Sequence, residues 1–210
     1  LNWFWGSEHN LGDRDNILMA VDYFWRIKPG TIVYQTLLWD ELDWAKLFKP
    51  WWGNKYVFQT GVYWVPFTNP KYPDFRVEWT ASRPWVYTHY DSLITYTSAD
   101  IGIGFPEGPN SQLLYVETNW WMSPQSLWRI SYRHLVKGSG LGSNPTHNYN
   151  DRDSSLDENT PTLLGETTVS NKIELRGTYR LSLMLEGFAN ISYQDQTSQA
   201  TGQIGFVYNW

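Results

Sequence analysis

The sequence predicts an all-β fold: an antiparallel up-and-down transmembrane β-barrel, or the roughly ten-stranded C-terminal part of a larger one. Three observations favour this fold. Segments of strand length alternate apolar and polar residues at every second position. A polar mean hydropathy of -0.48 is combined with 14 Trp and 14 Tyr among 210 residues. Short and long connections alternate along the chain, which is typical of barrels with periplasmic turns and extracellular loops.

Four alternating segments occupy the N-terminal part of the chain. Successive side chains of a strand point to opposite faces, so in the first segment Met19 and Val21 share one face. The tight turn Lys28-Pro29-Gly30 leads into the second segment, and Arg83-Pro84 breaks the alternation of the fourth. The segments are Asn16–Ile27, Thr31–Trp39, Lys55–Pro66 and Phe75–Tyr87.

Five more segments follow. In the clearest of them, Ile173 and Leu175 share one face while Lys172 and Glu174 share the other. The last has aromatic or apolar residues at every second position up to Trp210, which predicts a closing strand that ends at the lipid interface. These segments are Gln112–Met122, Leu127–Lys137, Asn171–Tyr179, Ser182–Tyr193 and Thr201–Trp210.

The connections indicate an orientation for the barrel. We expect the long connections Thr88–Ser111 and Gly138–Thr168 to be extracellular and the short ones Lys28–Gly30 and Ser123–Ser126 to face the periplasm. Strands in lipid must satisfy their backbone groups, so the sheet is expected to close, alone or with further strands. The alternative, a soluble all-β sandwich, does not sort its connections in this way.

Composition excludes several classes of protein. No run of about 18 apolar residues is present, which excludes a membrane helix. A formal net charge of -5 argues against nucleic acid as a partner. The chain has no cysteine, so it can form neither disulfides nor thiolate metal sites.

We expect residues 1–210 to form a single outer-membrane barrel domain that lacks N-terminal strands. The chain starts without an initiator Met or the features of a signal peptide. Leu1–Trp5 is interpreted as the end of a strand already under way, which would make the sequence a fragment.

The middle of the chain resembles the Wzi-type outer-membrane capsule assembly proteins. The resemblance lies in the strings "VEWTASRPWVYTHY", "GPNSQLLYVE" and "ISYRH", and in the earlier "YQTLLWDELD", which leads into a helical outer loop. It implies a monomeric barrel of about eighteen strands that holds capsular polysaccharide at the surface of a Gram-negative-type bacterium. The segment "THNYNDRDSSLDENT" has no counterpart in that family, so no ligand role is implied for it.

Charged residues on the polar side of the strands form the first candidate site. They would line the lumen and contact an anionic polysaccharide or another polar solute, with Arg129 and Arg133 as candidate contacts. The alternative is a cross-strand network of ion pairs that stiffens a narrow or closed lumen. The set is Asp22, Arg26, Arg76, Glu78, Arg129, Arg133, Lys172, Glu174, Arg176 and Glu186.

Aromatic residues of the outer loops form the second candidate site. Exposed rings beside polar groups suit the faces of sugars. The alternatives are an aromatic girdle at the membrane interface, or a cluster that packs an Asp43–Phe48 helix onto the rim. The candidate polysaccharide contacts are Trp44, Trp51, Trp85, Tyr87 and Tyr90.

The sequence nominates no catalytic residue, metal site or cofactor. Asp151, Asp153 and Asp157 lie close together with Ser155 and Glu158, but Leu156 stands where an EF-hand loop has its tight-turn glycine. A solvated acidic loop is the preferred interpretation over a calcium site. The four histidines are too far apart in sequence to nominate a site.

These observations favour a non-enzymatic outer-membrane protein that attaches or helps to assemble capsular or related polysaccharide through its extracellular loops. The expected partners are membrane lipid, lipopolysaccharide and the surface polysaccharide, with the protein as a monomer. The first alternative is a porin-like channel for small polar solutes. The second is an outer-membrane hydrolase, which would require a convergent Ser/His/acid set that the sequence does not provide.

Overall fold

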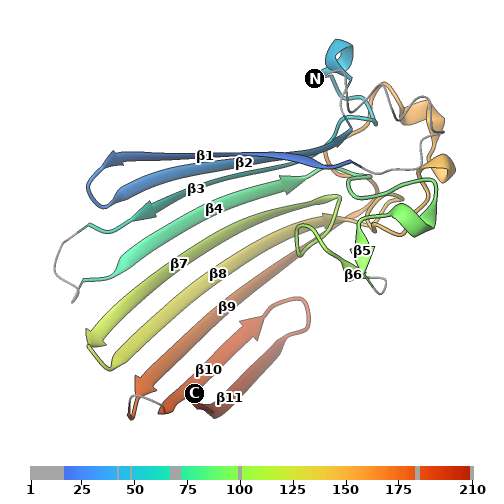
Figure 1. Cartoon of the computed structure of the whole chain (residues 1–210). Coiled ribbons are helices and arrows are strands. Elements are labelled where there is room, and N and C mark those ends of the chain that lie inside the picture. The colour runs from blue at the N-terminus through green and yellow to red at the C-terminus, as the bar shows by residue number, and fades with distance from the viewer. Residues whose placement is uncertain are drawn as a thin grey trace.

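The chain forms one long antiparallel sheet and a short hairpin. The structure is a computed structural model that describes residues 17–41, 43–47, 49–66, 72–98, 101–182 and 185–208. Nine strands pair in up-and-down order, β1-β2-β3-β4-β7-β8-β9-β10-β11, and β5 pairs with β6 (Figure 1). The strands are β1 (Met19–Lys28), β2 (Thr31–Glu41), β3 (Lys55–Trp64), β4 (Asp74–Ser82), β5 (Thr97–Ser98), β6 (Ile101–Gly102), β7 (Ser111–Ser123), β8 (Ser126–Gly138), β9 (Thr167–Arg180), β10 (Leu185–Gln194) and β11 (Gln199–Tyr208).

The nine long strands confirm the nine alternating segments. The fourth strand ends at Ser82, earlier than Tyr87, because Pro84 has no N–H to donate and the chain turns there. The seventh begins at Thr167, before the predicted Asn171. The predictions for Leu1–Trp5 and Trp210 concern residues outside the described part of the chain.

Connections are sorted between the two ends of the sheet. The β1–β2, β3–β4, β7–β8 and β9–β10 connections lie at one end, here the turn end. The β2–β3, β4–β7 and β8–β9 loops gather at the other, the long-loop end, with the shorter β10–β11 turn (Figure 1). This sorting agrees with the predicted alternation of short and long connections except at β10–β11, which the sequence suggested as a long connection but where only residues 195–198 separate the strands.

In the part of the chain that the structure describes, helical structure is confined to single 3-10 turns in the long loops: η1 (Trp44–Lys46), η2 (Ser92–Ile94), η3 (Tyr149–Asp151) and η4 (Ser154–Leu156). The expected Asp43–Phe48 helix is therefore only the turn η1, which the Asp43 side chain caps by accepting from the N–H of Ala45 at 2.9 Å. Within the described residues, no helix is long and apolar enough to cross a bilayer.

Strand register divides the sheet into two chemically different faces. The apolar face carries, for example, Val33, Val62, Val77, Val116 and Tyr132 in one row across β2, β3, β4, β7 and β8. The polar face carries the alternate residues, among them Arg76, Glu117, Ser131 and Glu174 in one row across β4, β7, β8 and β9. These faces are the ones that the sequence alternation predicts.

The apolar face is largely exposed. Ile204 is 85% exposed, Phe206 69% and Ile191 61%, although each is a large hydrophobic side chain. The only buried hydrophobic cluster among the described residues lies beneath the long loops, where Val57, Val86 and Tyr87 meet. The sheet is also not closed, since β1 and β11 each pair with a single strand.

Aromatic side chains form a row on the apolar face at the turn end. They belong to seven of the nine long strands, and register places them on the same side of the sheet. Six of them are counted among the exposed large hydrophobic residues, and Trp64 and Phe75 stack at 5.6 Å between ring centroids. The row consists of Trp25, Trp64, Phe75, Trp120, Trp128, Tyr179 and Tyr208.

Candidate functional site

A network of hydrogen bonds and ion pairs crosses the polar face. The Tyr34 hydroxyl on β2 donates to Glu78 Oε2 on β4 at 2.7 Å, and Arg76 pairs with the same oxygen at 2.5 Å. The two strands are not neighbours, because β3 lies between them. Gly61 occupies the crossing point on β3, where a Cβ would lie 2.3 Å from the Tyr34 ring. The glycine therefore lets the tyrosine reach across a strand.

The network continues across β7 and β8. Asn119 donates to Asp74 Oδ1 and to Glu117 Oε1, both at 3.0 Å. Arg129 Nε donates to Asn119 Oδ1 at 2.8 Å and lies 3.4 Å from Glu117 Oε2. On β9, Lys172 pairs with Glu174 at 3.1 Å. Charges of both signs thus compensate one another along the face.

The candidate ligand residue Arg133 is held by a long loop. Its guanidinium pairs with Glu107 of the β4–β7 segment, and Lys137 Nζ donates to the backbone oxygen of Glu107 at 2.5 Å. Both cations belong to the polar face of β8. The segment after β4 therefore bends over the polar face at the long-loop end, where Glu107 pairs with Arg133. This pair, together with the pair of Arg129 and Glu117, supports the ion-pair interpretation of both arginines.

Trp85 and Tyr87 fix that segment to the sheet. Their side chains are 2% and 1% exposed, and both residues have positive φ values, 68° and 70°, which non-glycine residues rarely adopt. The Tyr87 N–H donates to Asp40 Oδ2 at 2.8 Å, and its hydroxyl accepts from the Phe105 N–H at 2.9 Å. Burial raises the pKa of the Tyr87 hydroxyl. The expectation that these two rings are exposed sugar contacts is therefore corrected, because neither ring can reach solvent.

Tyr90 and Trp51 remain accessible. Tyr90 is 37% exposed and its ring lies 4.3 Å from that of His89, while Trp51 is half-buried beneath the Lys46 ammonium, 4.9 Å from the ring centroid. Trp44 begins η1, and its side chain lies outside what the structure describes. The five aromatic candidates therefore do not form one surface.

A second set of residues, which the sequence analysis did not nominate, joins the loops. Lys55 is fully buried, 3.1 Å from Glu41 and 4.3 Å from the centroid of the Tyr149 ring. The Arg152 guanidinium lies 3.8 Å from the centroid of Trp52. Two cations on two aromatic rings thus connect the β2–β3 and β8–β9 loops. The only sequence feature that pointed to these cation–π contacts is the large number of Trp and Tyr residues, some of them close to basic residues in the loops.

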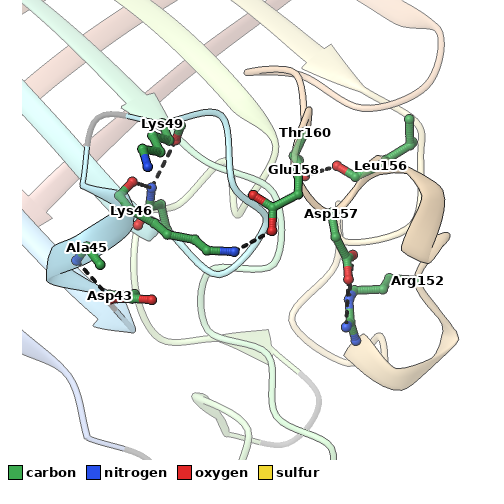
Figure 2. Close-up of polar contacts among 10 residues, drawn as sticks. Asp43, Ala45, Lys46, Lys49, Arg152, Leu156, Asp157, Glu158 and Thr160 are labelled. Atoms are coloured by element: carbon green, nitrogen blue, oxygen red, sulfur yellow. Dashed lines mark hydrogen bonds and ion pairs between the residues drawn. The ribbon is translucent and has the colours of Figure 1, made fainter.

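Acidic residues of the β8–β9 loop are also engaged by protein groups. Asp157 binds Arg152 through two hydrogen bonds, at 2.9 and 3.1 Å, and Glu158 pairs with Lys46 of the β2–β3 loop (Figure 2). Asp153 caps η4 by accepting from the Ser155 N–H at 3.0 Å, and this hydrogen bonding lowers the pKa of the Asp153 carboxyl. Among the described residues, no three His, Asp or Glu side chains gather in a way that could hold a metal ion.

Asn110 links the β4–β7 segment to the β8–β9 loop. It is fully buried with a φ of 60°, a value that asparagine tolerates better than most residues. Its side-chain amide donates to the Leu164 oxygen at 2.9 Å and accepts from the Leu164 N–H at 2.7 Å. The three long loops are therefore one interconnected structure.

Comparison with known proteins adds no family. No protein-family model matches the chain, and no curated protein matches it.

Proposed function

We propose that this sheet is part of an outer-membrane β-barrel that holds surface polysaccharide at its long-loop end. One observation carries the proposal: a single sheet combines an exposed apolar face, an aromatic row at the turn end of that face and all the long loops at the opposite end. Outer-membrane barrels carry an apolar band with aromatic residues at the membrane interfaces, and the aromatic row at the turn end fits one of these interfaces. The resemblance to Wzi-type capsule assembly proteins supports the polysaccharide as ligand.

The loop arrangement favours attachment over transport. Glu107 extends from the β4–β7 segment to Arg133 and Lys137 on the polar face, so the lumen side of the sheet is covered at its outer end. The proposed polymer contacts are Tyr90 and Trp51, which remain accessible there. The protein acts as a binding protein in this proposal, without a catalytic step.

Polymer retention by intact cells tests the proposal. A stacked ring contributes only about 0.5–1.5 kcal/mol, so Tyr90→Ala alone should release little polymer, whereas Tyr90→Ala combined with Trp51→Ala should release much more. Leu93→Ala is the matched control, because Leu93 is 89% exposed in the same loop and is not aromatic. Equal release by the control and the double variant would contradict the proposal.

The porin-like alternative makes a different prediction. It requires steady ion conductance of the protein in planar bilayers, sensitive to Arg129→Gln and indifferent to Tyr90→Ala. Open-channel conductance in the unmodified protein, with polymer retention unaffected by the double variant, would favour the channel. A closed lumen that conducts only after Glu107→Ala would support the attachment function.

A further inference from the structure

A groove lies on the apolar face beneath the long loops. Its volume is about 830 Å³, within the range of about 300–1,000 Å³ that is usual for ligand sites. The floor of the groove is formed by four side chains of the apolar face, Leu37, Phe58, Trp79 and Ala81. In the proposed barrel this face is in contact with lipid, so the groove opens toward the membrane. We call it the rim groove.

Two long loops form the roof of the rim groove. The backbone N–H of Thr160 donates to the backbone oxygen of Pro50 at 2.6 Å, and the backbone N–H of Trp52 donates to the backbone oxygen of Asp157 at 2.9 Å. The ion pair between Lys46 and Glu158 also joins these two loops (Figure 2). The groove is therefore a built feature of the fold, held open between the sheet and a braced pair of loops.

Arg83 brings an uncompensated positive charge to the groove. It is 7% exposed, and its guanidinium donates only to backbone oxygens, those of Trp51, Thr160 and Pro161 at 3.2–3.4 Å. Its Nε has no hydrogen-bond partner, and no carboxylate among the described residues pairs with it. Burial without a counter-ion lowers the pKa of Arg83 and is costly for a cation.

Lys49 adds a second cation at the same place. It lines the groove from the β2–β3 loop and is exposed, and within the described part of the chain no carboxylate lies in ion-pair range of its ammonium. The groove thus combines an apolar floor on the membrane side with two positive charges at the end where the strands leave the proposed membrane. An amphiphile with an acyl chain and an anionic head complements both parts.

We propose that the rim groove binds one phosphorylated acyl lipid of the outer leaflet, with the acyl chain along Phe58 and Trp79 and the phosphate near Lys49 and Arg83. The guanidinium geometry suits phosphate oxygens, and Lys49 contributes as a point charge. The inference rests on the proposed membrane location of the apolar face. It assigns the groove a function separate from polymer binding, which involves Tyr90 and Trp51.

The test measures lipid retention in detergent, so it does not depend on polymer binding. The full chain is folded in micelles that contain phosphatidic acid and phosphatidylcholine with identical acyl chains, and bound lipid is counted by native mass spectrometry. We expect one phosphatidic acid per chain, retained in preference to phosphatidylcholine. Lys49→Gln should reduce its retention roughly fivefold, as expected for the loss of one cation near a phosphate. Ala81→Phe, which fills the floor, should reduce retention of both lipids.

Matched controls separate the groove from general effects. Ala200→Phe adds the same ring to the apolar face near the long-loop end of β11, and Lys28→Gln removes a cation at the turn end, so neither should change retention. Arg83 itself is not varied, because it also holds three loop carbonyls in place. Equal retention of the two lipids, or no effect of Lys49→Gln and Ala81→Phe, would overturn the proposal. Polymer release by the Tyr90 and Trp51 variants is scored separately, so either proposal can fail without the other.

Discussion

At the scale of single residues, the aromatic side chains of the long loops divide into packing residues and accessible residues. Trp85 packs against Gly142, where a Cβ would lie 2.6 Å from the indole, and the backbone N–H of Trp85 donates to the backbone oxygen of Gly142 at 3.0 Å. Tyr90 keeps 37% of its surface exposed. Sequence cannot distinguish the two cases, because a ring in a loop has no periodic pattern to indicate which side of it is covered.

This division predicts opposite effects of alanine substitution. Trp85→Ala should destabilise the fold by about 3–5 kcal/mol, since it removes a buried ring and leaves a cavity. Tyr90→Ala should change the free energy of unfolding by about 1 kcal/mol or less. Urea titration of the protein folded in detergent measures both. A Trp85→Ala variant as stable as Tyr90→Ala would contradict the packing assignment.

At the scale of elements, the alternation of apolar and polar residues was sufficient to predict the nine long strands and which side chains share a face of the sheet. Successive side chains of a strand point to opposite faces, so the pattern itself assigns each residue to one face. Strand ends were harder to place. The fourth segment was predicted to run to Tyr87, but β4 ends at Ser82, just before Arg83-Pro84. The β5–β6 hairpin has two residues in each strand and is too short to show a period. The contacts of Lys55 and Arg152 with aromatic rings depend on which loops lie side by side in the folded protein. A local sequence pattern carries no information about that.

The crossing of Tyr34 over Gly61 gives a prediction at this scale. Gly61→Ala would place a Cβ 2.3 Å from the Tyr34 ring, so the ring must move and Glu78, which is 7% exposed, loses its hydroxyl partner. Glu78 keeps its ion pair with Arg76, so the expected loss in the free energy of unfolding is that of one hydrogen bond to a charged group, about 1.5–3 kcal/mol. Gly202→Ala is the control, because the nearest atom to its Cβ would be 3.9 Å away.

A double-mutant cycle identifies the cause of any loss. In a Tyr34→Ala background the ring is absent, so Gly61→Ala should cost much less than it does in the unmodified chain. Equal costs in the two backgrounds would show that Gly61 acts through the backbone of β3 and that the tyrosine crossing contributes nothing.

At the scale of the whole molecule, the described sheet has an apolar face without a covering layer and a polar face on which Arg76, Arg129, Arg133 and Lys172 each pair with a carboxylate. In water such a sheet would leave large side chains such as Ile173 and Ile204 exposed, at 53% and 85%. Contiguous apolar surfaces of this extent mark contact with a membrane or another protein. A closed barrel in lipid would cover the apolar face and pair the edges of β1 and β11, which is why closure belongs to the proposed function.

The facing of β9 is the most direct test of this arrangement. Ile173→Arg puts a charge on the apolar face and should cost about 2–4 kcal/mol if the residue lies near the bilayer midplane. Glu174→Gln weakens only the half-exposed ion pair with Lys172, which should cost about 0–1 kcal/mol. Ile173→Leu, which keeps the side chain apolar and of similar volume, should cost less than about 1.5 kcal/mol and so isolates the effect of the charge. Folding titrations in lipid vesicles compare the three variants. If Glu174→Gln were the most damaging, the polar face would be the one in contact with lipid, and the proposed barrel would be inside out.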